Sequence, residues 1–295
     1  MKHRARRDAP IGEILAEMMP LSSGRTRKQL LEHRRVTVEG RVAAKASHPV
    51  KAGNEVEITP PRKPAELPAG LEIRHEDSDL VVARKSPGLL TIATPAEKEK
   101  TAYAYLSAHV KRLRPGAKIF VVHRLDKLAS GLLVFAKSEE TKAALQAQFE
   151  AHTVEREYVA IVEGRLRSEK GTLESRIEEA GPGRVRETRS ASRGRVAITH
   201  YRVIEARGRF SLLELRLETG RKNQIRVQLE GIGAPIVGDA VYGSRIDPLA
   251  RLALHARTLG FEHPGTGERL LFDDPVPPEF IRLVRAEPSL PRGQT

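Results

Sequence analysis

Apolar and polar side chains alternate with a period of two along much of this 295-residue chain. In residues 210–220, Leu213, Leu215 and Leu217 alternate with charged side chains, which is typical of an antiparallel strand with one buried face. Helical spacing is confined to a few stretches, such as residues 102–113. Because strands outnumber helices and follow one another directly, the pattern predicts an α+β fold with a mixed, mainly antiparallel β-sheet.

A change of pattern near residue 60 divides the chain. Residues 60–70 hold four prolines and no apolar periodicity, which indicates a semi-rigid linker. Ahead of it, helical spacing over residues 11–18 and a second short helix around Leu30 precede several short strands. We therefore predict a small α/β domain over residues 1–62, with the linker running to about residue 70, and a larger domain over residues 63–295.

The charge balance indicates the class of partner. The net charge is +13 and the isoelectric point is about 10.1, so a polyanion, most simply nucleic acid, is the expected partner. An acidic membrane surface is the alternative, but there is no basic amphipathic helix and no apolar run near the ~20 residues of a spanning segment. The arginine-rich residues 181–195 are either a solvated loop or an arm that contacts phosphates.

The absence of cysteine excludes disulfides, thiolate zinc sites and cysteine nucleophiles, and it fits a reducing cytoplasm. The basic first ten residues lead into no apolar core of a signal peptide. We therefore expect a cytoplasmic protein that does not associate with membranes. Its oligomeric state is left open by the sequence, with a monomer expected.

Several familiar chemical motifs are missing. The glycine-rich stretch 231–243 lacks the third glycine of a dinucleotide fingerprint, and no Walker motif or G-x-S-x-G elbow occurs. The acidic residues in "RHEDSD" (74–79) stand directly before a strand and are interpreted as a polar turn, not a metal site. The sequence thus predicts no metal and no nucleotide cofactor.

A polar turn between two apolar runs is the strongest candidate for chemistry. In "FVVHRLDKLASGLLVFAKS" (120–138), Arg124 and Asp126 stand between segments with the composition of buried strands. A lone Arg-x-Asp at a strand end is usually a surface ion pair. Three further segments change this interpretation, namely "ARKSPGLL" (83–90), "EREYVAIVEG" (155–164) and "LETGRKNQIRVQLEGIGAPIVGD" (217–239).

In this order, the four segments resemble the motifs of the RluA-type pseudouridine synthases. The resemblance covers residues 70 to about 281, including the closing stretch "LALHARTLGFEHPGTGERLLFDDPVPPEF". Residues 11–58 resemble the small S-four RNA-binding domain, which is named after a ribosomal protein and precedes many synthases of this family. The opening of its first helix is altered here to "DAPIGEIL". The resemblance implies an RNA pseudouridine synthase that uses no cofactor.

The reaction explains why such residues are needed. Pseudouridine formation breaks the N-glycosidic bond of uridine, turns the base and rejoins it through carbon 5. It requires a carboxylate at the sugar, a cation to keep that carboxylate ionised, and a flat side chain against the base. By resemblance, Asp126, Arg226 and Tyr158 fill these three roles.

The resemblance also implies which residues contact RNA. The target uridine must leave its helix or loop, and in the family the arginine of the HRLD turn, here Arg124, helps to hold the opened RNA. The remaining expected contacts are Lys85, Arg221, Lys222 and Asn223 in the larger domain and Arg25, Arg27 and Lys28 in the small domain.

Three positions depart from the usual family pattern, which has Thr at Ala129 and His at Asn223 and Gln228. Amide side chains still donate hydrogen bonds, so we expect altered RNA contacts with catalysis retained. The S-four-like domain favours ribosomal RNA as substrate. Transfer RNA is an alternative, and a non-catalytic RNA-binding factor in ribosome assembly is another.

Overall fold

The computed structural model describes residues 1–32, 34–59, 67–181 and 184–286. They form two compact units, one of residues 1–67 with 105–118 and one of residues 68–104 with 119–295. Most of the predicted linker and the predicted boundary at residue 62 lie outside the described residues. No helix within the described ranges is long and apolar enough to cross a membrane.

The part of the N-terminal unit before residue 60 combines two short helices with small sheets. Ile11, Ile14 and Leu15 of α1 and Leu30 and Leu31 of α2 are buried in its core. A four-stranded sheet has the order β1-β6-β3-β4, and β2 pairs with β5. The elements are β1 (Lys2–Arg4), β2 (Ala9–Pro10), α1 (Ile11–Met18), α2 (Gly24–Glu32), β3 (Val36–Val38), β4 (Arg41–Val42), β5 (Pro49–Val50) and β6 (Glu55–Ile58).

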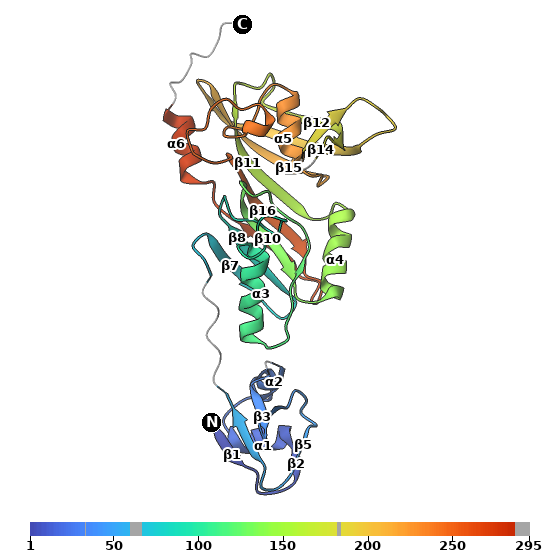
Figure 1. Ribbon diagram of the computed structural model, residues 1–295, viewed down its shortest axis with the longest axis vertical. Coiled ribbons are helices and arrows are strands. Elements are labelled where there is room, and N and C mark those ends of the chain that lie inside the picture. The colour runs from blue at the N-terminus through green and yellow to red at the C-terminus, as the bar shows by residue number, and fades with distance from the viewer. Residues whose placement is uncertain (33, 60–66, 182–183, 287–295) are drawn as a thin grey trace. The chain divides into compact units, whose positions relative to one another are not determined.

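An 11-stranded sheet forms the second unit (Figure 1). Its main order is β13-β12-β14-β15-β11-β16-β10-β8-β7, with β17 beside β16 and β9 beside β10. Among the strand pairs of the described residues, only β10 and β16 run parallel. The predicted mixed, mainly antiparallel sheet is therefore confirmed. The strands are β7 (Leu71–Glu76), β8 (Leu80–Lys85), β9 (Phe120–Val121), β10 (Ser130–Ala136), β11 (Glu155–Glu163), β12 (Lys170–Glu179), β13 (Val185–Thr188), β14 (Arg195–Arg207), β15 (Phe210–Leu217), β16 (Leu254–Glu262) and β17 (Arg269–Asp273).

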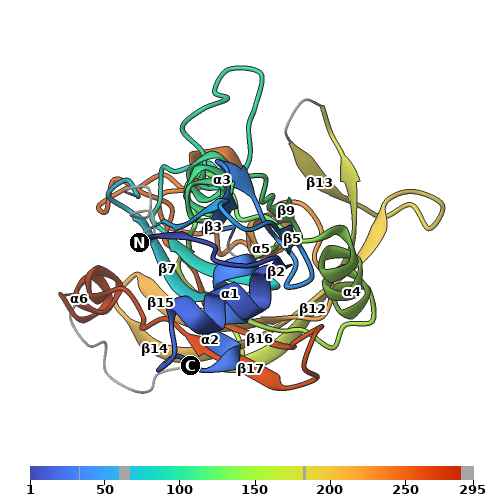
Figure 2. The same ribbon diagram turned by 90° about the horizontal axis from the view of Figure 1, so that it is seen from below.

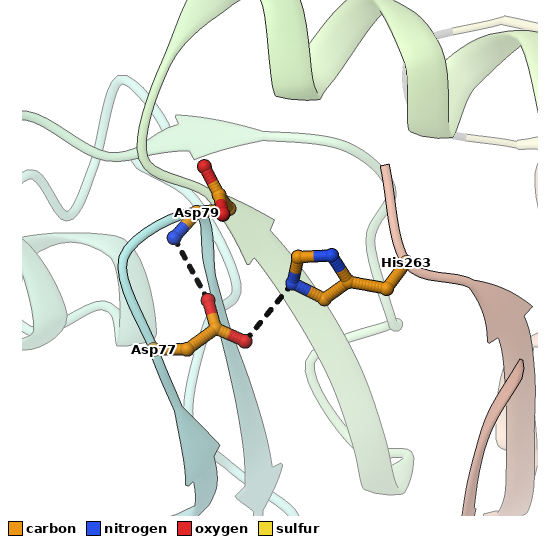
Figure 3. A group of neighbouring side chains, drawn as sticks. All are labelled: Asp77, Asp79 and His263. Atoms are coloured by element: carbon orange, nitrogen blue, oxygen red, sulfur yellow. Dashed lines mark hydrogen bonds and ion pairs between the residues drawn. The ribbon is translucent and has the colours of Figure 1, made fainter. Parts of the chain in front are cut away.

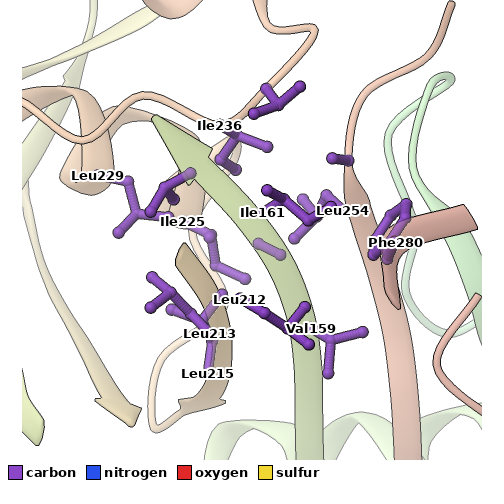
Figure 4. Close-up of a cluster of buried hydrophobic side chains, with 14 of the residues drawn as sticks. Val159, Ile161, Leu212, Leu213, Leu215, Ile225, Leu229, Ile236, Leu254 and Phe280 are labelled. Atoms are coloured by element: carbon purple, nitrogen blue, oxygen red, sulfur yellow. The ribbon is translucent and has the colours of Figure 1, made fainter. Parts of the chain in front are cut away.

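Helices α4 (Glu139–Glu150), α5 (Gln224–Gly231) and α6 (Pro278–Ala286) belong to the second unit, and α3 (Ala102–Leu113) has residues in both. Figure 4 shows Ile225 and Leu229 of α5 in one apolar cluster with Val159 and Ile161 of β11. A spacing of four residues places Ile225 and Leu229 on one face of the helix. This packing holds α5 against the strand that carries Tyr158.

The parallel pair of β10 and β16 requires a glycine. Gly131 has φ +112, and a Cβ atom there would lie 2.1 Å from the carbonyl oxygen of Ala256. Only glycine permits this approach and this backbone conformation without strain. The close approach anchors the start of β10, and so the turn carrying Asp126, against the centre of the sheet.

The arginine-rich segment 181–195 differs from a plain loop. Residues 182–183 lie outside the described part, but Val185–Thr188 form β13, which pairs with β12 at the end of the sheet seen on the right of Figure 2. Val185 is buried in a small cluster with Ile177 and Tyr242. Burial of this single apolar side chain accounts for strand structure in a stretch that is otherwise polar.

Candidate active site

Asp126 and Arg226 meet in the lining of a pocket in the second unit. A guanidinium nitrogen of Arg226 donates to Asp126 Oδ2 at 3.1 Å, although the residues are 100 positions apart in sequence. The Asp126 side chain remains 26% exposed, whereas that of Arg226 is 13% exposed. The carboxylate is therefore paired on one side and accessible on the other, as a group that reacts with a bound substrate must be.

Asp239 holds the Arg226 guanidinium in place. Arg226 Nε and Nη2 donate to the two carboxylate oxygens of Asp239 at 2.7 and 2.8 Å, in the parallel fork geometry of a strong pair. The guanidinium also lies 4.7 Å from the ring centre of Tyr242. Burial alone would lower the pKa of Arg226, but the hydrogen bonds and charges of Asp239 and Asp126 outweigh it and raise that pKa. Arg226 is therefore a permanent cation beside Asp126.

Tyr158 of β11 lines the same pocket, together with Leu217, Leu254 and Ile225. The pocket is small, about 70 Å³, and is lined by both apolar and polar side chains. Burial raises the pKa of Tyr158, and the negative charge of Asp126 adds to this against the opposing effect of Arg156. The phenol is thus neutral at pH 7 and offers a flat ring with a hydroxyl that can donate or accept.

Lys85 is not at the surface, where an RNA contact would be made. It is fully buried, and its ammonium donates to the backbone carbonyls of Ser86, Lys127 and Ala129. Two of these carbonyls belong to the turn that carries Asp126. Burial lowers the pKa of Lys85 to about 7, opposed by the charge of Asp126. Lys85 thus lies beneath the turn that carries Asp126, and no part of its side chain is exposed for the RNA contact that we expected.

Two further contacts brace this turn. The Thr91 hydroxyl donates to the carbonyl of Leu125 at 2.9 Å and accepts from its amide at 3.2 Å. Behind the turn, Ser130 Oγ lies 2.8 Å from Nδ1 of His255 and accepts from Arg251 at 2.6 Å. Ser130 and His255 are both buried, so this group braces the turn and does not face a substrate.

Asn223 and Gln228 of the QIR segment have structural contacts. Asn223 adopts a left-handed conformation at the start of α5, accepts from Arg226 at 3.2 Å and donates to the Tyr242 hydroxyl at 3.0 Å. Gln228 is buried, and its amide accepts from Thr199 and donates to the carbonyls of Leu173 and Ala197 and to Ser175 Oγ. The departure at Gln228 thus changes an interior network, not an exposed RNA contact as we expected. Asn223 also lines the pocket.

The remaining expected RNA contacts differ in exposure. Arg124 is exposed at the pocket rim, and Lys222 is exposed beside it. Arg221 lines the pocket while its Nε donates to the carbonyl of Val196 at 3.1 Å. In the N-terminal unit, Arg25 and Lys28 are exposed on α2, whereas Arg27 donates to the carbonyl of Ser22 and so holds the turn between α1 and α2.

The acidic turn before β8 gains a histidine from a distant segment. His263 lies beside Asp77 and Asp79, and these three side chains could surround a cation (Figure 3). However, His263 Nδ1 accepts from the amides of Gly265 and Thr266 at 3.0 and 3.1 Å, so its proton is on Nε2, which lies 3.1 Å from Asp77. Neither ring nitrogen offers a free lone pair, so the arrangement suits a turn brace better than a metal site.

Sequence reasoning missed three residues of the site. Asp239 and Tyr242 lie in the glycine-rich stretch 231–243, to which the sequence assigned no role, and Gln224 lies between Asn223 and Arg226. Gln224 links the end of β15 to α5, because its amide accepts from Thr219 and from the amide of Arg221 and donates to Ile198. An acidic residue directly after a glycine, near a motif arginine, is the signal that could have indicated Asp239.

Comparison with known proteins identifies the family of this chain. The family model described as RNA pseudouridylate synthase matches residues 79–231, and that of the S4 domain matches residues 13–56, within the S-four-like segment. An uncharacterized RNA pseudouridine synthase of Bacillus subtilis, YlyB, is 37% identical over 87% of this chain and 87% of its own length. The ribosomal large subunit pseudouridine synthase D of Pseudomonas aeruginosa is 39% identical over 72% of this chain and 71% of its own.

A second synthase D, from Nitrosomonas europaea, is 34% identical over 96% of this chain and 86% of its own. Among solved structures, the human RNA pseudouridylate synthase domain containing 4 superposes with a TM-score of 0.61 and 26% identity, covering 72% of this chain and 92% of its own. The chain therefore belongs to the RNA pseudouridylate synthase family, and it is an isomerase that converts uridine in RNA to pseudouridine.

Proposed function

We propose that this synthase modifies uridines of large-subunit ribosomal RNA in the cytoplasm, with Asp126 as the nucleophile and no cofactor. The observation that carries the proposal is the Asp126–Arg226 pair in the lining of the pocket, with an accessible carboxylate held by a buried cation. Two relatives whose names refer to the large ribosomal subunit support the choice of RNA, as does the S4 domain.

In the proposed mechanism, the Asp126 carboxylate attacks or stabilises C1′ of the ribose while the bond from C1′ to N1 breaks. The uracil turns within the pocket, and C5 then forms the new bond to C1′ as the carboxylate leaves. The proton on C5 is lost and N1 gains one, so the product is an isomer and Asp126 is regenerated. No atom or electron is taken from a cofactor.

The other residues have supporting roles. Arg226 offsets the charge of Asp126 and leaves one oxygen open to the sugar. Tyr158 packs its ring against the freed base, and its neutral hydroxyl is available for the proton transfer at C5. Arg124 at the rim contacts the displaced RNA strand. The buried contacts of Lys85, Thr91 and Ser130 keep the turn rigid, so the carboxylate position does not depend on bound substrate.

The proposal is tested by mapping pseudouridines across ribosomal and transfer RNA from cells with and without the gene. Loss of pseudouridine at defined large-subunit positions, restored by the wild-type gene and not by Asp126→Asn, is expected. Loss confined to transfer RNA would overturn the ribosomal substrate while leaving the chemistry intact. Restoration by Asp126→Asn would overturn the role of Asp126.

A further inference from the structure

The turn that carries Asp126 has an apolar residue at its centre. The amide of Ala129 donates to the carbonyl of Asp126 at 3.2 Å, which closes a four-residue turn. Both ends of this turn line the pocket that also holds Tyr158. The two central residues, Lys127 and Leu128, are exposed, and Leu128 is 44% exposed. A large apolar side chain therefore faces solvent two residues from the reacting carboxylate.

Neither turn chemistry nor core packing accounts for leucine at this position. The centre of a tight turn favours Gly, Pro, Asn, Asp or Ser, and apolar surface left in water adds nothing to stability. A single exposed leucine is common on protein surfaces and would mean little by itself. Leu128, however, combines an unfavourable turn residue with a place beside the site of chemistry. Local preferences are most often broken at functional positions.

The backbone on both sides of Leu128 is held in place from within the protein. The carbonyl of Lys127 accepts from the amide of Gly88 at 2.8 Å and from the ammonium of Lys85 at 3.1 Å. The same ammonium also donates to the carbonyl of Ala129. Since the turn is fixed at the residues before and after Leu128, the exposed side chain is presented from a rigid support.

The reaction on RNA creates a gap that such a side chain can fill. The target uridine must leave its stack before its glycosidic bond can be attacked, and its former neighbours then lose a stacking partner. Proteins that open a base stack often insert an apolar side chain, leucine included, between the bases. Two residues of chain span at most about 7 Å, so Leu128 lies close to the ribose that Asp126 must reach. Stacked bases are about 3.4 Å apart, so this reach covers about two base steps.

We propose that Leu128 is a wedge that enters the base stack beside the target uridine and occupies the space that the extruded base leaves. Leu128 is a positioning residue, because it contacts the neighbouring bases and not the reacting atoms. The proposal rests on the proposed function, since the role of Asp126 determines where the target ribose lies. It also divides the RNA contacts of this segment: Arg124 supplies charge, and Leu128 supplies apolar surface.

The test compares two RNAs with the full-length protein. One is the shortest hairpin in which wild type forms pseudouridine, and the other has an abasic residue on each side of the target, so that the uridine has no stacked neighbour. Single-turnover rates are measured at saturating protein. On the intact hairpin, Leu128→Ala should be about tenfold slower than wild type. On the abasic hairpin it should be within about twofold of wild type, because no stack has to be opened.

A fluorescent base reports the wedge without turnover, and it decides the question if wild type does not modify the abasic hairpin. With 2-aminopurine next to the target, saturating wild type should increase the emission, because the fluorescent base loses its stacking partner. Leu128→Ala should increase it about half as much or less. Lys127→Ala is the matched control, since Lys127 is exposed in the same turn but ends in a charge. It should resemble wild type in the ratio of the two rates and in the emission.

Two results would overturn the wedge. An equal loss of rate on both hairpins would mean that Leu128→Ala only distorts the turn. An unchanged rate and an unchanged emission would mean that Leu128 is an ordinary surface residue. The proposed function fails in a different way, namely if wild type forms no pseudouridine in any RNA or if Asp126→Asn keeps the wild-type rate. An active wild type with either of the first two results removes only the wedge.

Discussion

The turn that carries Asp126 and the helix that carries Arg25 and Lys28 are both polar, but their side chains are held in opposite ways. Around the turn, Lys85, Thr91 and Ser130 are buried and hydrogen bonded. On α2, Arg25 and Lys28 are exposed, and the ion pair of Lys28 with Glu32, at 3.7 Å, is long. Positioning a reacting atom requires rigidity, whereas contacting phosphates requires only charge at the surface.

The largest expected effect on activity comes from a change in the turn that carries Asp126. Asp126→Asn should abolish isomerisation, lowering the single-turnover rate by about 10⁴-fold or more, because the amide cannot act as nucleophile. RNA affinity should stay within a few-fold of wild type, since the shape and polarity of the side chain are kept. Rapid-quench measurements with tritium-labelled uridine, together with a binding titration, check both quantities. A variant with near-normal single-turnover rate would contradict the assignment.

Arg226→Met should reduce the rate next most strongly, by about 10²- to 10³-fold, because it removes the cation paired with a half-buried carboxylate. Asp239→Asn should cause part of the same loss, since Asp239 holds the Arg226 fork. The double variant should be little slower than Arg226→Met alone, because Asp239 acts through Arg226. Fully additive losses in single-turnover rate would mean that Asp239 has a separate role.

The strands of the large sheet and the residues of the site could both be predicted from the sequence, but for different reasons. The strands follow from the period-two alternation, as in Leu213, Leu215 and Leu217, because one face of the sheet must be apolar. The pairing of Asp126 with Arg226, 100 residues apart, came only from the family resemblance. No local pattern encodes which strands become neighbours, since this depends on the register of the whole sheet.

The residues whose contacts the sequence analysis did not predict show that contacts between distant segments cannot be deduced from local patterns. Lys85 follows an apolar strand like any basic residue at a strand end, and only the folded turn supplies the carbonyls that bury it. His263 reaches Asp77 across 186 residues, a contact invisible to spacing. Asp239 ends the segment 217–239 that carries the family resemblance, but the sequence indicated no role for it, because its pairing with Arg226 exists only in the folded protein. In each case, the missing information was a contact between distant segments.

Lys85 gives a prediction about stability. With a pKa of about 7 in the folded protein against 10.5 for the free side chain, the unfolded state binds more protons between these values. The free energy of unfolding of wild type should therefore rise with pH from 7 to 10.5 relative to Lys85→Met, with a slope approaching about 1.4 kcal/mol per pH unit. Below pH 7 the difference should be constant, because Lys85 is charged in both states.

Denaturant titrations of both proteins at several pH values measure this difference. Lys222→Met is the matched control, since Lys222 is exposed and should give a curve parallel to wild type. A flat difference between wild type and Lys85→Met from pH 7 to 10.5 would mean that the Lys85 ammonium stays protonated on its three carbonyls.

The smallest expected effect, on RNA affinity, comes from changes to the exposed basic residues of α2. Residues 1–62 carry 13 Lys and Arg against 7 acids, a net charge of +6, and we predict that this domain tethers the enzyme to RNA through phosphates. Arg25→Ala with Lys28→Ala should weaken RNA binding several-fold and make the slope of log affinity against log salt shallower by roughly one to two. Lys45→Ala with Lys51→Ala removes the same charge from exposed sites outside α2 and should change the slope less. Equal slopes for the two double variants would show that net charge alone governs the tether, and an unchanged slope in both would show that this domain does not bind RNA phosphates.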